Sequence, residues 1–256
     1  MGRVIAVTNE KGGVGKTTLT VNLGAALAIR GKKVLLVDLD PQGNSTFILS
    51  PEVTEETPTI YDVLIGKDTS IRSIIRATRT NGLSIAPSNL HLAGAEITLA
   101  QEYGRENALK RKLIQEVRNA YDYILIDTSP SLGLLTINAF TTADYALIPI
   151  ACDFLSLVGL TLLLNTIRLT QENLGSQIAV LGFVLNKYDR RVNISDEVVN
   201  IVRGKFPTQL FDTLIRVNVK LKEAPANHMS IFEYDPVCTG SKDHLALANE
   251  IIEKVP

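Results

Sequence analysis

Short runs of apolar residues alternate along this chain with longer segments whose apolar positions recur every three to four residues. Six of the short runs lack polar alternation, which is typical of strands buried on both faces of a parallel sheet. These runs cover residues 4–7, 34–37, 83–86, 123–126, 146–150 and 180–185. The pattern therefore predicts a sheet that is mostly parallel.

The segments between these runs predict helices. Leu19, Leu23 and Leu27 fall at helical spacing after the first strand, and Gly31 stands where a helix commonly ends in the left-handed conformation. Further helices are expected at residues 106–119, 133–142, 155–171, 195–205 and 243–254, and residues 50–58 are the most loop-like. Strands that alternate with helices predict an α/β fold, a doubly wound sheet flanked by helices, and we expect residues 1–256 to form one domain.

Length and composition limit the classes of protein to which this chain can belong. A chain of 256 residues with 45% hydrophobic residues can bury a large core. It has no apolar stretch long enough to span a bilayer, and its first residues lack the apolar core of a signal peptide, so we expect a cytoplasmic protein. Cys152 and Cys238 lie far apart and without C-x-x-C spacing, which predicts two buried free thiols.

A glycine-rich loop joins the first strand to the first helix. Residues 11–18 read Lys-Gly-Gly-Val-Gly-Lys-Thr-Thr. Glycines let a phosphate approach the backbone amides at a helix N-terminus, where the helix dipole favours an anion. Lys16 is expected to reach the β and γ phosphates, and the Thr17 hydroxyl to bind Mg²⁺. The predicted nucleotide-binding residues of this loop are Lys11, Gly12, Gly13, Val14, Gly15, Lys16, Thr17 and Thr18.

This loop departs from the usual phosphate-loop pattern G-x-x-x-x-G-K-[ST]. Glu10 occupies the place of its first glycine, and Lys11 adds a second lysine five positions before Lys16. The sequence therefore predicts a deviant form of the phosphate loop in a P-loop ATPase fold.

Acidic residues follow two of the predicted strands. Asp38 and Asp40 come after the second strand and share parity, so both carboxylates face one side while the chain stays extended. Asp127 ends an apolar strand, which is the Walker-B position that holds Mg²⁺. Because ligands of such sheets collect at the carboxyl ends of the strands, we expect these acids to lie near the glycine-rich loop.

Three segments together resemble the ParA group of the ParA/MinD ATPases, which act in plasmid and chromosome partition. They are residues 11–18, the Val-Asp-Leu-Asp-Pro-Gln-Gly-Asn of 37–44 and the Ile-Asp-Thr-Ser-Pro-Ser of 126–131. The resemblance implies an ATPase that uses Mg²⁺, is weak alone, forms a homodimer with ATP and is stimulated by a ParB-like centromere-binding protein.

The resemblance also implies roles for individual residues. Lys11 crosses the dimer interface to the phosphates of the other subunit, whereas Lys16 binds those of its own. Asp40 orients the attacking water. Asp127 anchors the water shell of Mg²⁺, and Asp38 supports the same region, so both acids are expected to hold the metal through water.

The sequence does not decide which nucleotide base this site binds. Asn186-Lys187-Tyr188-Asp189 matches the guanine-reading motif of GTPases, whereas the resemblance implies that Asn186 contacts adenine. ParA relatives also have an Ile-Pro-Arg-Asn-Val-Arg-Leu motif near the base. Residues 215–221 of this chain read Ile-Arg-Val-Asn-Val-Lys-Leu, without the proline.

Basic residues are concentrated between positions 186 and 222. This segment has eight Lys and Arg against four Asp and Glu, while the whole chain has a net charge of −1. The imbalance predicts a surface for the phosphate backbone of DNA without sequence preference, although scattered solvated charges explain such a run as well. The expected DNA contacts are Arg190, Arg191, Arg216, Lys220 and Lys222. Arg191 and Lys220 align with residues that ParA proteins use for nonspecific DNA, which implies association with the nucleoid.

Three other classes of protein share this fold. A MinD-type switch acting on a membrane would end in a basic amphipathic helix, but residues 243–254 have more acid than base. An electron donor of the nitrogenase iron-protein type would need cysteines elsewhere than Cys152 and Cys238. A small-substrate ligase such as dethiobiotin synthase has no use for Lys11 or for a basic flank. We therefore expect no membrane partner.

Overall fold

The computed structural model describes residues 1–66 and 68–256. In this part of the chain, eight strands form one sheet in the order β3-β4-β2-β5-β1-β6-β7-β8. The strands are β1 (Arg3–Val7), β2 (Val34–Leu39), β3 (Arg76–Ala77), β4 (Leu83–Ala86), β5 (Tyr123–Thr128), β6 (Tyr145–Ala151), β7 (Ala179–Tyr188) and β8 (Ile215–Arg216). All neighbouring strands are parallel except β3 with β4. The predicted doubly wound, mostly parallel sheet is confirmed.

All six predicted strands are present. The pattern missed β3 and β8, which have two residues each and are too short to show a periodicity. The chain adds β2 and β4 on one side of the sheet and β6, β7 and β8 on the other, so its course reverses beside β1. Sheets of this kind bind ligands where the course reverses, and the glycine-rich loop follows β1 there.

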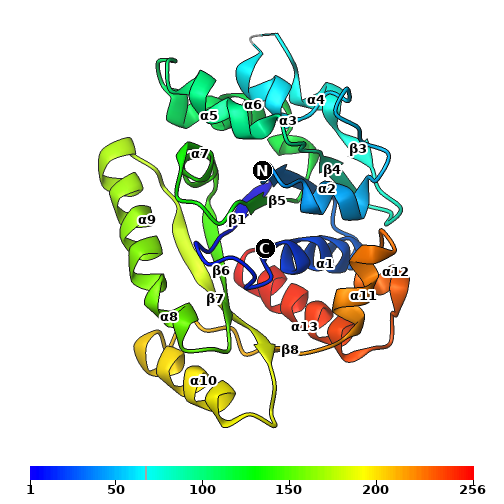
Figure 1. Cartoon of the computed structure of the whole chain (residues 1–256), viewed down its shortest axis with the longest axis vertical. Helices are drawn as coiled ribbons and strands as arrows, with labels where there is room; N and C mark the ends of the chain where they lie inside the picture. Colours follow the sequence, from blue (N-terminus) through cyan, green and yellow to red (C-terminus); the bar gives the residue numbers. More distant parts are fainter. Residues whose placement is uncertain (67) are drawn as a thin grey trace.

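Helices cover both faces of the sheet. Helices α1 (Lys16–Ile29) and α13 (Thr239–Lys254) pack on one face, and α7 (Leu134–Thr142) and α9 (Leu160–Leu174) on the other (Figure 1). Strand β1 shows why both faces are apolar. Val4 and Ala6 belong to one hydrophobic core, and Ile5 and Val7 belong to the other.

The structure contains further helices. They are α2 (Asn44–Leu49), α3 (Ile60–Ile65), α4 (Ile71–Ile74), α5 (Leu92–Leu99), α6 (Ala108–Glu116), α8 (Leu155–Val158), α10 (Asn193–Lys205), α11 (Lys220–Ala226) and α12 (Ile231–Tyr234). Two 3₁₀ turns, Arg105–Asn107 and Arg118–Ala120, flank α6. The predicted helices 133–142 and 195–205 correspond to α7 and α10, and residues 50–58 form a loop.

Three predicted helices have different bounds in the structure. The segment 106–119 is split because Asn138 of α7 accepts from the backbone N–H of Leu109 and donates to the carbonyl of Arg105, so the α-helix starts only at Ala108. The segment 155–171 divides at Gly159, where the Glu10 carboxylate occupies the space that a side chain would need. Helix α13 begins earlier than predicted, at Thr239.

Both cysteines are free, as predicted, but they differ in burial. Cys152 is buried, whereas Cys238 is half-buried. The Cys238 sulfur accepts a hydrogen bond from the backbone N–H of Ser241 and so caps the start of α13. Among the described residues, we find no helix that combines the length and the apolar character needed to cross a bilayer.

Candidate functional site

The glycine-rich loop is shaped by backbone conformations that favour glycine. Gly13 and Gly15 have φ angles of +76° and +91°. At Gly15, a Cβ would also lie 2.3 Å from Nδ2 of Asn186, so the site has no room for a side chain. That amide nitrogen donates instead to the carbonyl of Val14 at 2.8 Å. The structure therefore brings Asn186, at the end of β7, directly against the loop.

The loop leads into α1, whose first residue is Lys16. Gly15 is the N-cap, and no side chain in the described part of the chain caps this helix end. An uncapped N-terminus leaves backbone N–H groups for an anion. Lys16 is buried, and its Nζ lies 3.4 Å from the carbonyl oxygen of Lys11. Burial lowers the pKa of Lys16, while the charges of Asp127 and Asp40 oppose that shift.

Asp38 and Asp127 lie side by side below this loop. They pair in register on β2 and β5, and both are fully buried. Burial raises the pKa of both carboxyls, and the charge of Asp127 raises that of Asp38 further. A divalent cation with its water shell would relieve this cost, because oxygen ligands and nearby negative charge are what Mg²⁺ prefers. The donor set therefore fits the predicted metal.

Hydroxyl groups from two helices contact these acids. Ser45 Oγ donates to Asp127 Oδ2 at 2.7 Å, and Thr20 Oγ1 lies 3.3 Å from Asp127 Oδ1. The side chain of Thr17 also hydrogen-bonds to Asp127, so it lies beside the buried acids. Thr46 donates to Asp38 Oδ2 from both its N–H and its hydroxyl, each at 2.8 Å.

Asp40 is held in the turn that follows β2. Its carboxylate accepts from the backbone N–H of Gln42 at 2.9 Å, and its own N–H donates to Asp38 Oδ1 at 3.2 Å. Asp40 is 7% exposed, and its carboxylate is close enough to Lys16 to influence the pKa of that ammonium. The three acids singled out from the sequence are thus brought together beside Lys16.

Lys11, the second lysine of the loop, contacts residues that follow β6. Nζ of Lys11 forms an ion pair with Asp153 Oδ1 at 2.6 Å and lies 3.1 Å from Ser156 Oγ. Sequence reasoning missed both partners. Asp153 follows β6, so the rule that drew attention to Asp40, a polar residue just after a strand, also finds it.

Residues at the end of β7 and the start of α11 form a cavity beside the loop. It has a volume of about 140 Å³, and we call it the base cavity. Its walls include Gly15, Thr18, Asn186, Arg216 and Lys222. Lys187 was also missed as a neighbour of the loop: it has a φ of +58°, and its Nζ reaches the Gly13 carbonyl at 2.5 Å.

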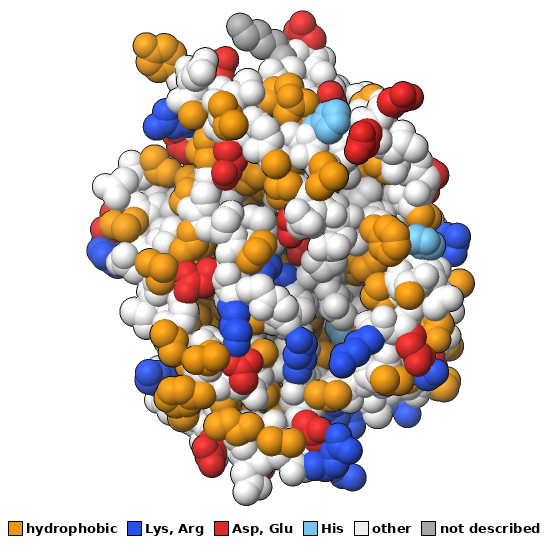
Figure 2. Space-filling model, in the orientation of Figure 1, with side chains coloured by type: hydrophobic (Ala, Val, Ile, Leu, Met, Phe, Trp, Pro, Cys, Tyr) orange, Lys and Arg blue, Asp and Glu red, His pale blue; other side chains and the backbone are white. Residues whose placement is uncertain are grey.

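Three of the five predicted DNA contacts gather in a second cleft. Arg190, Arg191 and Arg216 line it together with Asp189 and Thr239, and its volume is about 470 Å³. We call it the arginine cleft. Figure 2 shows Lys and Arg side chains concentrated on the half of this face that carries β8 and α11 in Figure 1.

The other two predicted DNA contacts lie outside the arginine cleft. Nζ of Lys220 forms an ion pair with Glu223 at 2.9 Å and lies 5.5 Å from the ring centroid of Tyr234. Lys222 is exposed and lines the base cavity. Residues 186–222 therefore do not form one uniform basic patch, because Lys220 on α11 contacts Glu223 and Tyr234 instead of the arginine cleft.

Comparison with known proteins agrees with this architecture. A family model described as an AAA domain matches residues 2–180. The sporulation initiation inhibitor protein Soj of Bacillus subtilis is 47% identical over 251 residues, which cover 98% of each chain. The chromosome-partitioning ATPase Soj of Treponema pallidum is 43% identical over 254 residues, which cover 99% of this chain and 98% of that one.

A solved structure extends the comparison to geometry. It is described as cobyrinic acid a,c-diamide synthase from Mycobacterium smegmatis with bound ADP and magnesium. It superposes with a TM-score of 0.85 at 33% identity and covers 99% of this chain and 95% of that one. The fold, the deviant loop with its buried acids, and the full-length relatives all agree. This chain belongs to the ParA/MinD family of ATPases, in the group that includes the Soj and ParA partition proteins.

Proposed function

We propose that this protein is an ATP-dependent dimerising switch that binds DNA without sequence preference and drives the partition or positioning of a chromosome, plasmid or similar cargo. One observation supports it above the others. Arg216 lines both the base cavity and the arginine cleft, so a nucleotide and a DNA phosphate would share one wall of the protein. A single sheet runs from Arg3 to Arg216, which supports one domain for the whole chain.

In this proposal, the phosphates of ATP lie on the backbone amides of residues 12–18, and Lys16 contacts the β and γ phosphates. Thr17 would hold Mg²⁺ directly, and Asp38 and Asp127 would hold it through water. Bound Mg²⁺ would neutralise charge on the phosphates. Because these acids and the Lys16 ammonium are buried away from bulk water, each of these charge interactions is strengthened.

Hydrolysis needs a positioned water and a further positive charge. We assign the water to Asp40, which its turn holds beside Lys16. The further charge comes from Lys11 of a second subunit, in the way that an arginine finger stabilises a phosphoryl-transfer transition state. Turnover then depends on dimerisation, and a ParB-like partner would accelerate it.

Adenine is the proposed base. Guanine recognition would require a free carboxylate at Asp189, but both of its oxygens accept from the Arg191 guanidinium, at 2.9 and 2.7 Å. Asp189 also lines the arginine cleft, whereas Asn186 lines the base cavity. This arrangement supports ATP over GTP.

DNA binding would follow from the arginine cleft. Arg190, Arg191 and Arg216 are proposed to contact phosphates, with Lys220 and Lys222 adding charge nearby. A dimer doubles the number of phosphates that are neutralised, so affinity should fall steeply with salt. The protein would therefore associate with the nucleoid when ATP is bound and leave it after hydrolysis, without a membrane target.

The test is binding to a random-sequence duplex with ATP, ADP or no nucleotide, across a salt series. We expect binding that requires ATP, falls with salt and weakens in Arg191→Ala and Lys220→Ala. Because Arg191 lines the arginine cleft and Lys220 lies outside it, the Lys220 substitution should have the smaller effect. Absence of DNA binding with every nucleotide would refute the proposal.

Similarity to a protein described as a cobyrinic acid a,c-diamide synthase makes a metabolite target the alternative. A thermal-shift screen with small carboxylates in the presence of ATP distinguishes the two. Stabilisation by DNA but not by carboxylates supports the switch, whereas the reverse result supports a ligase.

A further inference from the structure

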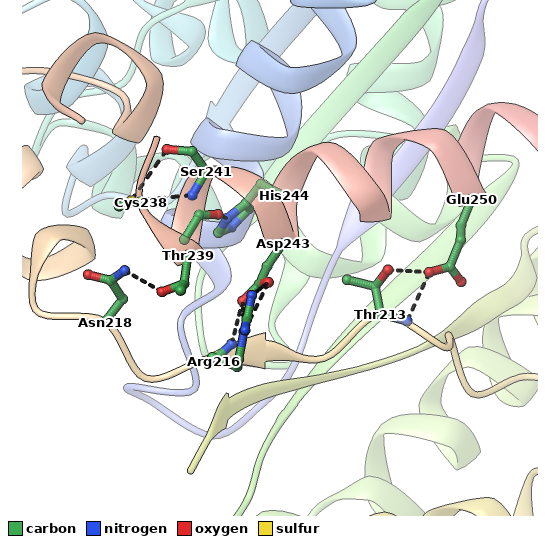
Figure 3. A network of polar contacts seen from close by, with 10 residues as sticks. Thr213, Arg216, Asn218, Cys238, Thr239, Ser241, Asp243, His244 and Glu250 are labelled. Atoms are coloured by element: carbon green, nitrogen blue, oxygen red, sulfur yellow. Dashed lines mark hydrogen bonds and ion pairs between the residues drawn. The ribbon is translucent and has the colours of Figure 1, made fainter. Parts of the chain in front are cut away.

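Helix α13 holds the short strand β8 along one polar face. Carboxylate oxygens of Glu250 accept from the backbone N–H groups of Asp212 and Thr213, at 3.0 and 2.8 Å. At the other end, Asn218 Nδ2 donates to Thr239 Oγ1 at 2.7 Å. Figure 3 shows the Thr213–Glu250 and Asn218–Thr239 contacts on either side of a third interaction, between Arg216 and Asp243.

The third interaction is the most extensive. Asp243 Oδ2 accepts from the backbone N–H of Arg216 at 3.0 Å, and the carboxylate accepts from Nε and Nη2 of the same guanidinium, at 3.0 and 2.5 Å. The Asp243 side chain is 8% exposed, whereas that of Arg216 is 47% exposed. A buried carboxylate therefore fixes the plane of a guanidinium that faces solvent.

This pairing leaves part of the guanidinium unused. Asp243 occupies the edge formed by Nε and Nη2, and among the described residues no partner contacts Nη1, so its N–H groups remain for a ligand in the arginine cleft. Arg191 is held in the same way, because both Asp189 oxygens accept from its Nε and Nη2. Each of these two arginines thus has an aspartate on one edge and the cleft on the other.

We propose that Asp243 is a positioning residue for DNA binding, which holds the Arg216 guanidinium in the orientation that meets a backbone phosphate. This inference rests on the proposed function, since it requires that the arginine cleft binds DNA. Asp243 itself touches no phosphate and acts through Arg216.

A positioning role for Asp243 and simple charge repulsion predict opposite changes in DNA affinity when Asp243 is replaced. An acidic side chain near bound DNA repels phosphates, so its removal should strengthen binding if charge alone matters. If Asp243 orients Arg216, its removal should weaken binding, because the long arginine side chain then has to be ordered when DNA binds. Asp212 provides a matched control, since it is an exposed acid on the same segment whose carboxylate does not contact Arg216.

The experiment measures the Kd for a random-sequence duplex with ATP, at several salt concentrations. We expect Asp243→Asn to weaken binding about fivefold to tenfold, and to lower the salt slope by about 0.9 for each phosphate that is no longer neutralised. Asp212→Asn should bind as tightly as the wild type or more tightly. Arg216→Lys keeps the charge but cannot form the two-pronged pair with Asp243, so it should also weaken binding.

A double substitution separates positioning from a general structural effect. In the Arg216→Ala background, Asp243→Asn should cause no further loss of affinity, because the residue through which it acts is gone. An equal loss in both backgrounds would overturn the proposal, as would Asp243→Asn or Arg216→Lys proteins with wild-type affinity. If the wild type itself fails to bind DNA with ATP, the proposed function fails instead.

Discussion

Nζ of Lys11 lies 2.6 Å from Oδ1 of Asp153 in the same subunit. The lysine proposed to cross a dimer interface therefore already has an ion-pair partner in its own subunit. Both side chains are partly exposed, 32% for Lys11 and 47% for Asp153, so the ion pair contributes at most about 1 kcal/mol. Release of Lys11 toward a second subunit would therefore cost little, and the interaction would favour the monomer only weakly.

Substitution of Asp153 should shift the equilibrium from monomer toward dimer. In Asp153→Asn, Lys11 loses its charged partner, so ATP-dependent dimers should form at a concentration about twofold to fivefold lower. Sedimentation with ATP measures the shift. Glu172→Gln, which removes an exposed ion pair with Arg168 on α9, is the control and should leave the dimer constant unchanged. A dimer weakened by Asp153→Asn would contradict this prediction.

Two glycines of the loop should respond differently to a side chain. Gly15→Ala combines a φ of +91° with a 2.3 Å approach to Asn186 Nδ2, so we expect a loss of about 1–3 kcal/mol in stability and weaker nucleotide binding. Around Gly12, a Cβ meets nothing within 4 Å in the described part of the subunit. Gly12→Val should therefore keep its melting temperature and ATP affinity and lose only the dimer. An ATP dimer of normal strength in Gly12→Val would place Gly12 away from the interface.

Lys16→Ala should remove most of the nucleotide affinity. The buried ammonium is the proposed ligand of the β and γ phosphates, and charged hydrogen bonds of this kind support a loss of about a hundredfold in affinity. Titration with a fluorescent ATP analogue measures the affinity, since the chain has no tryptophan to report on it. Retained affinity would refute the assignment of Lys16.

Asp40→Ala should separate binding from turnover. The variant should bind ATP and dimerise, because Asp40 is proposed to hold water rather than phosphate. Its hydrolysis rate should fall by at least about a hundredfold. The measurement is phosphate release at saturating ATP. Undiminished hydrolysis would remove Asp40 from the mechanism.

His244 should make the fold sensitive to acid. It is fully buried on α13, its Nδ1–H donates to the Gly240 carbonyl at 2.7 Å, and its Nε2 has no partner among the described residues. Burial lowers its pKa from 6.5 to about 4. Protonation therefore favours the unfolded chain, so the stability is present above pH 6.5 and is lost as the pH falls toward 4.

The measurement compares wild type with His244→Leu in denaturant melts between pH 7 and pH 4. The buried acids Asp38 and Asp127 have raised pKa values and oppose this trend in both proteins, so the difference between the two isolates the histidine. We expect the wild type to lose on the order of 3 kcal/mol more than the variant across this range. Parallel losses would show that His244 contributes nothing to the acid response.

The sequence alone determined the elements whose signals are local. The buried strands appear as unbroken apolar runs because both faces of a parallel sheet are covered, and the loop of residues 11–18 is recognisable because a phosphate-binding backbone needs glycines at fixed spacing. Asp38, Asp40 and Asp127 could be named in advance because they come directly after the apolar runs 34–37 and 123–126. The family, and with it the ATPase activity, follows from these same segments.

The tertiary structure decided which distant residues meet. Lys11 and Asp153 are 142 positions apart, and their ion pair depends on β6 lying next to β1. Strand β8 has two residues and exists because β7 and α13 flank it, so neither it nor the pairing of Arg216 with Asp243 leaves a periodic trace. Charge counts located a basic segment, but only the packing of α11 and α13 divided it into a cleft lined by arginines and a separate Lys220 paired with Glu223. Sequence patterns record the burial of each element, whereas the order of the strands fixes the neighbours of each side chain.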